Sequence, residues 1–270
     1  MTGSPQPAPA PRDRTPASRV SSWLADMAPR DHREADAMSR RRRTVVAGTL
    51  VAGAGLLGAS LSAEPDSTEF YVLTLGLAGT WLIGGLRSGP LHLGWVQTQH
   101  GTVRRPVIEP IATGAAAFGA FYGAARLARR VPILSQAIAS VLQYAHRGSR
   151  PLVLATTLAN GVGEEVFFRG GIYAAAGIKH PVPTSTAIYT LAAAATRNPG
   201  LVLASGVMGA LFALQRRAYG GIQAPILTHL TWSTLILRYL PPLFPTPPSQ
   251  RNAHPWPGRA RRGPAPLTAQ

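Results

Sequence analysis

Residues 161–170 read GVGEEVFFRG, and they place two adjacent carboxylates, Glu164 and Glu165, inside an apolar run. The run covers residues 151–178, which is enough to cross a bilayer because a spanning helix needs about 20 residues. Ionisable side chains at that depth are costly, and they usually serve a function. After the first 69 residues the chain contains only one other acid, Glu109. The pair is therefore the first place to look for chemistry.

The composition indicates a polytopic membrane protein. The 270 residues are 46% hydrophobic and only 14% charged, and the charge is concentrated at the ends and in short loops. Although the formal net charge is +16, nine arginines lie in residues 1–43 and four in residues 251–262. Such basic tails suit the anionic headgroups of a lipid bilayer, so no nucleic-acid partner is expected. Because the chain has no cysteine, disulfides, thiolate metal sites and thiol nucleophiles are excluded.

Apolar runs separated by charged or proline-containing turns predict an all-α membrane helix bundle of about eight spans, with six as the lower bound. The runs are residues 45–63, 70–86, 107–127, 131–145, 151–178, 183–196, 200–214 and 222–240. The run 131–145 is short, so a tilted or partly embedded helix fits it as well as a full span. The runs 183–196 and 200–214 are also short, and we expect them to pack inside the bundle.

The positive-inside rule orients the bundle. Four arginines, residues 40–43, directly precede the first span and place the N-terminus in the cytoplasm. Eight spans would return the C-terminus to the same side, so we expect a multi-pass protein of the cell membrane with both termini cytoplasmic. A twin-arginine export signal beginning at Ser39 is the alternative, but a soluble domain would normally follow it, and here further apolar runs follow.

The composition also divides the chain into parts. Residues 1–19 are rich in Pro, Ala, Ser and Arg and are predicted to be disordered, whereas residues 20–27 fit either disorder or a short interfacial helix. The parts are a basic cytoplasmic tail (1–43), two spans with a cytoplasmic loop (44–106), a helical core (107–240) and a disordered Pro- and Arg-rich tail (241–270).

The two glutamates are predicted to have different roles. On a helix, Glu165 and Arg169 are four residues apart and share a face, with the acid in the favourable N-terminal position. Glu164 is rotated by roughly 100° and has no local cation, which makes it the candidate general base. The structural alternative is that all three side chains form an ion cluster that only holds helices together.

His229 is the second candidate, because it is the only histidine inside a predicted span. Ser233 follows one turn later on the same helix face. An imidazole there can bind a metal, relay protons or donate a hydrogen bond to a developing oxyanion. A buried histidine that is simply hydrogen-bonded is the structural alternative.

These motifs resemble the CAAX prenyl protease and bacteriocin-processing (CPBP, or Abi) family of intramembrane endopeptidases. EEVFFRG, residues 164–170, is similar to the first motif of that family, and Thr228-His229-x-x-Trp232-Ser233 is similar to the last, a His followed four residues on by Asn. The similarity covers roughly residues 107–240. It implies a helical bundle with a water-filled cavity and a protein or peptide substrate in the membrane, which for characterised eukaryotic members is a C-terminal prenylated peptide.

The resemblance also implies roles for single residues. Glu164 would be the base that activates a water, Glu165 and Arg169 would orient the site, and His229 would stabilise the oxyanion or ligate zinc. The middle motif of the family, Phe-x-x-x-His, reads Phe212-Ala-Leu-Gln-Arg216 here, so Arg stands in place of His.

This departure leaves several hypotheses open. Arg cannot bind a metal, so a zinc site would keep only Glu164, Glu165 and His229. The expected cofactor is thus none, or a divalent metal such as zinc. The first hypothesis is hydrolysis with Arg216 or Ser233 as oxyanion donor. The second is an inactive member that acts as a membrane scaffold, and the third is a proton-coupled transporter that uses the buried acids.

Overall fold

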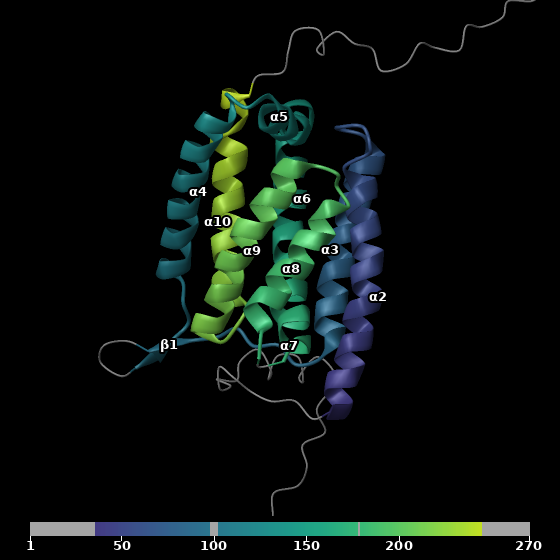
Figure 1. The fold of residues 1–270 in the computed structure, drawn as a ribbon, viewed down its shortest axis with the longest axis vertical. Coiled ribbons are helices and arrows are strands. Elements are labelled where there is room, and N and C mark those ends of the chain that lie inside the picture. Colours follow the sequence, from purple (N-terminus) through teal and green to yellow (C-terminus); the bar gives the residue numbers. More distant parts are fainter. Residues whose placement is uncertain (1–35, 98–101, 178, 245–270) are drawn as a thin grey trace, which may run out of the picture.

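The protein is an all-α helix bundle, as the sequence predicts (Figure 1). The computed structural model describes residues 36–97, 102–177 and 179–244. The elements are α2 (Asp36–Ser60), α3 (Thr68–Ser88), β1 (Val96–Gln97), β2 (Val103–Arg104), α4 (Ile108–Ala128), α5 (Pro132–Arg147), α6 (Arg150–Glu164), the π-helix η1 (Glu165–Ile172), α7 (Tyr173–Ala175), α8 (Pro181–Ala194), α9 (Pro199–Tyr219), α10 (Gln223–Tyr239) and the 3₁₀ turn η2 (Pro241–Leu243). The predictions for residues 1–19, 20–27 and 245–270 lie outside the described residues.

Three of the described helices are long and apolar enough to cross a membrane by themselves. They include residues 38–60 of α2, all of α3 and all of α9. Large apolar side chains point outward from the bundle, among them Val72, Leu191 and Val207, which are 62%, 71% and 64% exposed. Such an outer surface suits lipid, because water would penalise it.

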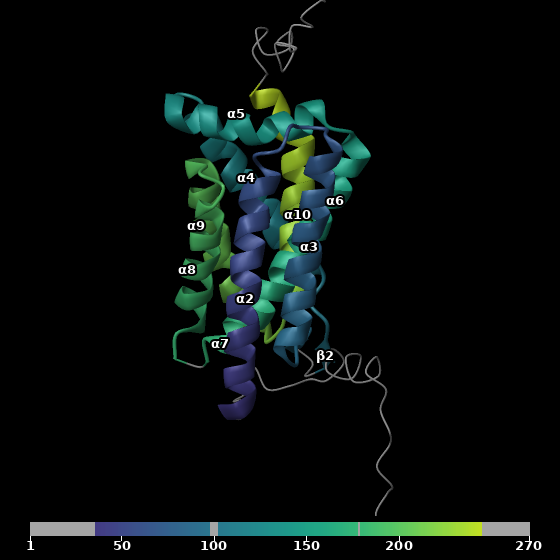
Figure 2. The same ribbon diagram turned by 90° about the vertical axis from the view of Figure 1, so that its right-hand side faces the viewer.

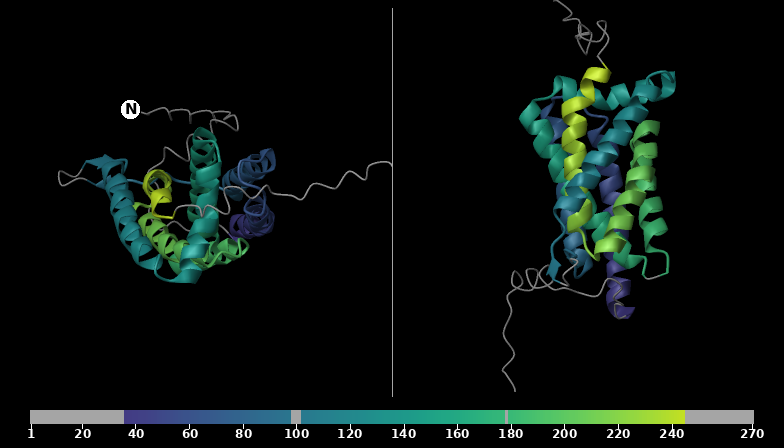
Figure 3. Two further views of the ribbon diagram at one scale, coloured as in Figure 1. Left: turned by 90° about the horizontal axis from the view of Figure 1, so that it is seen from above. Right: turned by 90° about the vertical axis from the view of Figure 1, so that its left-hand side faces the viewer.

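Helix α5 lies across one end of the bundle, whereas the other long helices run lengthwise (Figure 2). Seen from above, it covers the ends of its neighbours (Figure 3). The short run 131–145 thus forms a helix that caps the bundle and does not cross it, so the predicted count of eight spans is not confirmed. We call this end of the molecule the α5 end.

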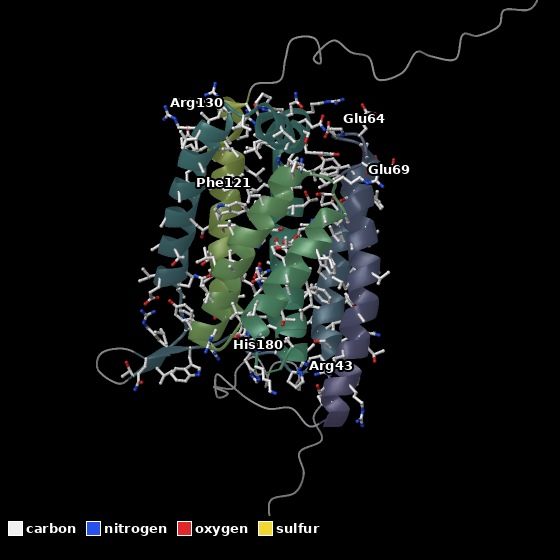
Figure 4. The ribbon with its side chains drawn as sticks, in the orientation of Figure 1. Arg43, Glu64, Glu69, Phe121, Arg130 and His180 are labelled. Atoms are coloured by element: carbon white, nitrogen blue, oxygen red, sulfur yellow. The ribbon has the colours of Figure 1, made fainter. Side chains whose placement is uncertain are left out.

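The described chain begins and finishes at opposite ends of the bundle. Arg43 and His180 lie at one end, which we call the Arg43 end, and Glu64, Glu69 and Arg130 lie at the α5 end (Figure 4). Helix α2 starts at the Arg43 end, and η2 lies at the α5 end (Figure 1). Because α5 does not cross, the parity argument for two cytoplasmic termini no longer holds.

The stretch 161–170 is held at the centre by aromatic packing. Phe167 stacks on Trp81 of α3 with ring centroids 4.7 Å apart, and Phe168 contacts the same indole at 5.1 Å. All three side chains are at most 1% exposed and belong to the largest apolar cluster of the bundle. The burial of three aromatic rings is a large apolar contribution, and it anchors the stretch against α3.

Glycine lets α6 approach α3 closely. A Cβ placed on Gly163 would lie 2.8 Å from the backbone oxygen of Ala78 and 3.2 Å from Cβ of Trp81. Backbone oxygen cannot move aside as a flexible side chain can, so the helices approach only because residue 163 has no side chain.

Gly163→Ala is therefore expected to destabilise the protein by about 1–3 kcal/mol, because the added methyl overpacks this contact. The free energy of unfolding, measured by SDS titration in detergent micelles, checks this prediction. Gly79→Ala is the matched control, because a Cβ at that position of α3 meets nothing within 4 Å. Equal stability of the two variants would contradict the role assigned to Gly163.

Candidate active site

Glu165 lies at the centre of a buried ion cluster. Its Oε1 accepts hydrogen bonds from Nη1 of Arg169 at 3.2 Å and from Nδ1 of His229 at 2.8 Å. The side chains of Glu165 and Arg169 are fully buried, and that of His229 is 9% exposed. The predicted pairing of Glu165 with Arg169 is confirmed, and α10 adds the imidazole to the same oxygen.

Arg169 is enclosed by aromatic rings as well as by acceptors. Its Nη2 donates to the backbone oxygen of Gly209 at 3.2 Å. The guanidinium carbon lies 4.3 Å from the ring centre of Tyr189 and 5.1 Å from that of Phe212. These cation–π contacts, with two hydrogen bonds, hold a charge that has no access to water.

The acids lie where the helix widens into a π-helix, which the sequence reasoning took as a continuous α-helix. The π segment η1 begins at Glu165, and Glu164 is the last residue of α6. Side chains from neighbouring helices donate to its carbonyls: Ser185 Oγ to Phe168 at 2.8 Å, and Arg216 Nε to Arg169 at 3.0 Å. Such widened turns occur often at functional sites, and these donors stabilise this one.

Glu164 has a different partner from Glu165. Its Oε2 accepts a hydrogen bond of 2.6 Å from the hydroxyl of Tyr189 on α8, and its side chain lines a cavity. The sequence reasoning did not identify Tyr189, because a tyrosine in an apolar span ordinarily belongs to the core. Only the packing of α8 against α6 shows what its hydroxyl reaches.

His229 faces the same cavity as Glu164. Its ring stacks on Phe212 of α9 with centroids 4.8 Å apart and an interplanar angle of 18°. Because a carboxylate only accepts hydrogen bonds, Nδ1 carries the hydrogen that Glu165 receives. The other ring nitrogen, Nε2, is therefore the one left for chemistry.

The cavity has a volume of about 310 Å³ and extends from Glu164 and His229 to the α5 end. Its walls are mostly apolar and come from α2, α3, α5, α6, α8, α9 and α10. Thr156, Asn160 and Glu164, one helical turn apart on α6, form a polar strip in this wall, and Ser233 lines it from α10. The site thus combines a few polar groups with an apolar chamber, as binding sites for organic ligands do.

Arg216 does not reach the cavity. It is 4% exposed, its Nε donates to the backbone oxygen of Arg169, and its guanidinium carbon lies 4.9 Å from the ring centre of Tyr173. Of the two oxyanion donors considered from the sequence, only Ser233 lines the cavity. Arg216 supports η1 from behind.

The donor set does not fit a zinc ion. Within the described ranges, no three His, Asp or Glu side chains converge in a way that could hold a metal. Oε1 of Glu165 is already shared by Arg169 and His229, and the position that would supply a second imidazole carries the cation Arg216. No step is therefore routed through a metal below.

Comparison with known proteins agrees with this geometry. Residues 147–235 match the family model described as Type II CAAX prenyl endopeptidase Rce1-like. This segment includes every acid, arginine and histidine of the site and lies within the predicted core 107–240. No curated protein and no solved structure matches the chain. The part of the chain that forms the site thus belongs to the Rce1-like CAAX prenyl endopeptidases, a family of membrane proteases, as its motifs predicted.

Proposed function

We propose that the protein is an intramembrane endopeptidase in which Glu164 activates the attacking water. One observation supports this most directly: Glu164 and His229 line the same cavity of an apolar bundle, while Glu165 and Arg169 lie behind them as a fully buried pair. A site that needs a base, an orienting shell and a group opposite the base has all three here.

The proposed reaction is hydrolysis of one peptide bond. Glu164 takes a proton from water as the water oxygen bonds to the carbonyl carbon, and the negative charge moves to the carbonyl oxygen. His229 and Ser233 are the groups on the facing wall that can donate to this oxyanion. The carbon–nitrogen bond then breaks, Glu164 returns the proton to the leaving amine, and a carboxylic acid and an amine are the products.

The proposed substrate is a peptide segment that enters the cavity from the membrane. The apolar walls suit a hydrophobic segment or a lipid chain, and the strip of Thr156 and Asn160 offers hydrogen bonds to a backbone. The description of the matching family points to a prenylated peptide. We therefore take a farnesylated C-terminal peptide as the first substrate to test and its unmodified form as the second.

A second candidate is a membrane scaffold without catalysis. The observation in its favour is Arg216, which replaces the middle-motif histidine and contacts the backbone of η1 instead of the cavity. On this reading the buried cluster holds the helices together and nothing is cleaved.

Cleavage in liposomes separates the two. Wild-type protein is expected to release fluorescence from a quenched peptide embedded in the same membrane, and protein-free liposomes are not. Ala204→Phe should lower the rate by at least about tenfold, because Ala204 lines the cavity and a misplaced substrate loses its alignment.

Leu203→Phe is the matched control, because the neighbouring side chain on α9 is 61% exposed and faces outward. Equal rates for the two phenylalanine variants would show that cleavage does not occur in this cavity. If wild-type protein cleaves neither peptide form, the scaffold is favoured.

A further inference from the structure

Tyr189 is the group that touches the carboxylate of Glu164. The Tyr189 hydroxyl lies 2.6 Å from Glu164 Oε2, and among the described residues no other hydrogen bond to Glu164 is made. The two residues lie 25 positions apart on α6 and α8, so this contact depends on how the helices pack.

The ring of Tyr189 is fixed on several sides. One face lies against the guanidinium of Arg169, 4.3 Å from its carbon, and Phe168 meets the ring at 4.8 Å with an interplanar angle of 62°. Gly209 leaves room on another side, because a Cβ there would come within 3.0 Å of Tyr189 Cδ1. A ring held in this way presents its hydroxyl in one direction.

This arrangement has a consequence for the carboxylate. A carboxylate joined to a flexible side chain can turn and offer either oxygen. The hydroxyl of Tyr189 occupies Oε2, so Oε1 is left for a water or a substrate in the cavity. Because the same ring contacts Arg169, the orientation of Glu164 is tied to that of the Arg169–Glu165–His229 cluster.

We propose that Tyr189 is a positioning residue of the peptidase site: its hydroxyl holds Glu164 Oε2 so that Oε1 faces the water that attacks the substrate. The proposal rests on the function proposed above. It identifies α8 as the helix that aligns the base, and it assigns no proton transfer to the tyrosine itself.

Tyr189→Phe is the decisive change, because it removes only the hydroxyl and keeps the ring against Arg169. We expect kcat for the embedded peptide to fall by about 10- to 100-fold, the cost of a slightly misplaced reacting group, with KM within about twofold of the wild-type value. Tyr122→Phe is the matched control: it removes a hydroxyl from α4, whose ring contacts Phe118 away from the site, and full activity is expected.

A measurement without turnover keeps this inference separate from the proposed function. The infrared C–O stretch of tyrosine carrying ¹³C in its ring reports whether the hydroxyl donates to a carboxylate. We expect one tyrosine band to be absent in Tyr189→Phe and to shift in Glu164→Gln, but to stay unchanged in Tyr122→Phe.

The outcomes divide cleanly. Loss of kcat in Tyr189→Phe together with the band shift supports the proposal. Wild-type kcat in Tyr189→Phe, while Glu164→Gln is inactive, overturns it and leaves the peptidase in place. A tyrosine band that ignores Glu164→Gln overturns it as well, even if no peptide is ever cleaved.

Discussion

Glu164→Gln is expected to abolish peptide cleavage while the protein stays folded. The amide keeps the shape of the side chain and can still accept the Tyr189 hydrogen bond, but it cannot take a proton from water. Loss of a general base lowers the rate by about 10²- to 10⁴-fold. Initial rates of fluorescence release in liposomes, compared with wild-type protein, measure the effect.

The control for this variant is the acid that lies far from the cavity. Glu109, in the first turn of α4, is 38% exposed and forms an ion pair with Arg104. Glu109→Gln removes the same charge and should cleave at the wild-type rate. Substantial cleavage by Glu164→Gln, with unfolding free energies alike in all three proteins, would remove Glu164 from the role of base.

Arg169→Met is expected to cause the largest loss of stability. The change leaves the fully buried Glu165 with only His229 as a donor and removes the hydrogen bond to Gly209. Breaking a buried ion pair from one side costs about 3–5 kcal/mol, because a charge stays behind without compensation. The free energy of unfolding in detergent micelles measures this loss.

A double-mutant cycle tests the cause. In Arg169→Met combined with Glu165→Gln no uncompensated charge remains, so the double variant should be more stable than Arg169→Met alone. If the double variant is as unstable as Arg169→Met, the loss comes from packing against Tyr189 and Phe212 and not from the stranded carboxylate.

Local patterns predicted the features that depend on neighbours in the chain. The hydropathy of the runs indicated a membrane helix bundle, because lipid accepts only segments that satisfy their own backbone hydrogen bonds. The four-residue spacing of Glu165 and Arg169 predicted their contact, which survives even though the helix is of π type there. His229 was found because a histidine inside an apolar span is rare.

Other expectations failed because they needed the packing of distant segments. The run 131–145 has the composition of a short span, yet α5 lies across the bundle, where the Tyr144 hydroxyl bonds to the backbone oxygens of Leu61 and Ala63. Arg216 was considered for the oxyanion, yet it supports the carbonyl of Arg169. Hydropathy and motif spacing contain neither the direction of a helix nor that of its side chains.

The sequence by itself determined that this is a membrane helix bundle, that its site lies at Glu164 and Glu165, and that Arg169 pairs with the second acid. Only the tertiary structure decided that Tyr189 meets Glu164, that His229 shares an oxygen of Glu165 with Arg169, and that Arg216 lies behind η1. The reason is physical: contacts within one or two helical turns follow from backbone geometry, whereas contacts between helices follow from how their surfaces pack.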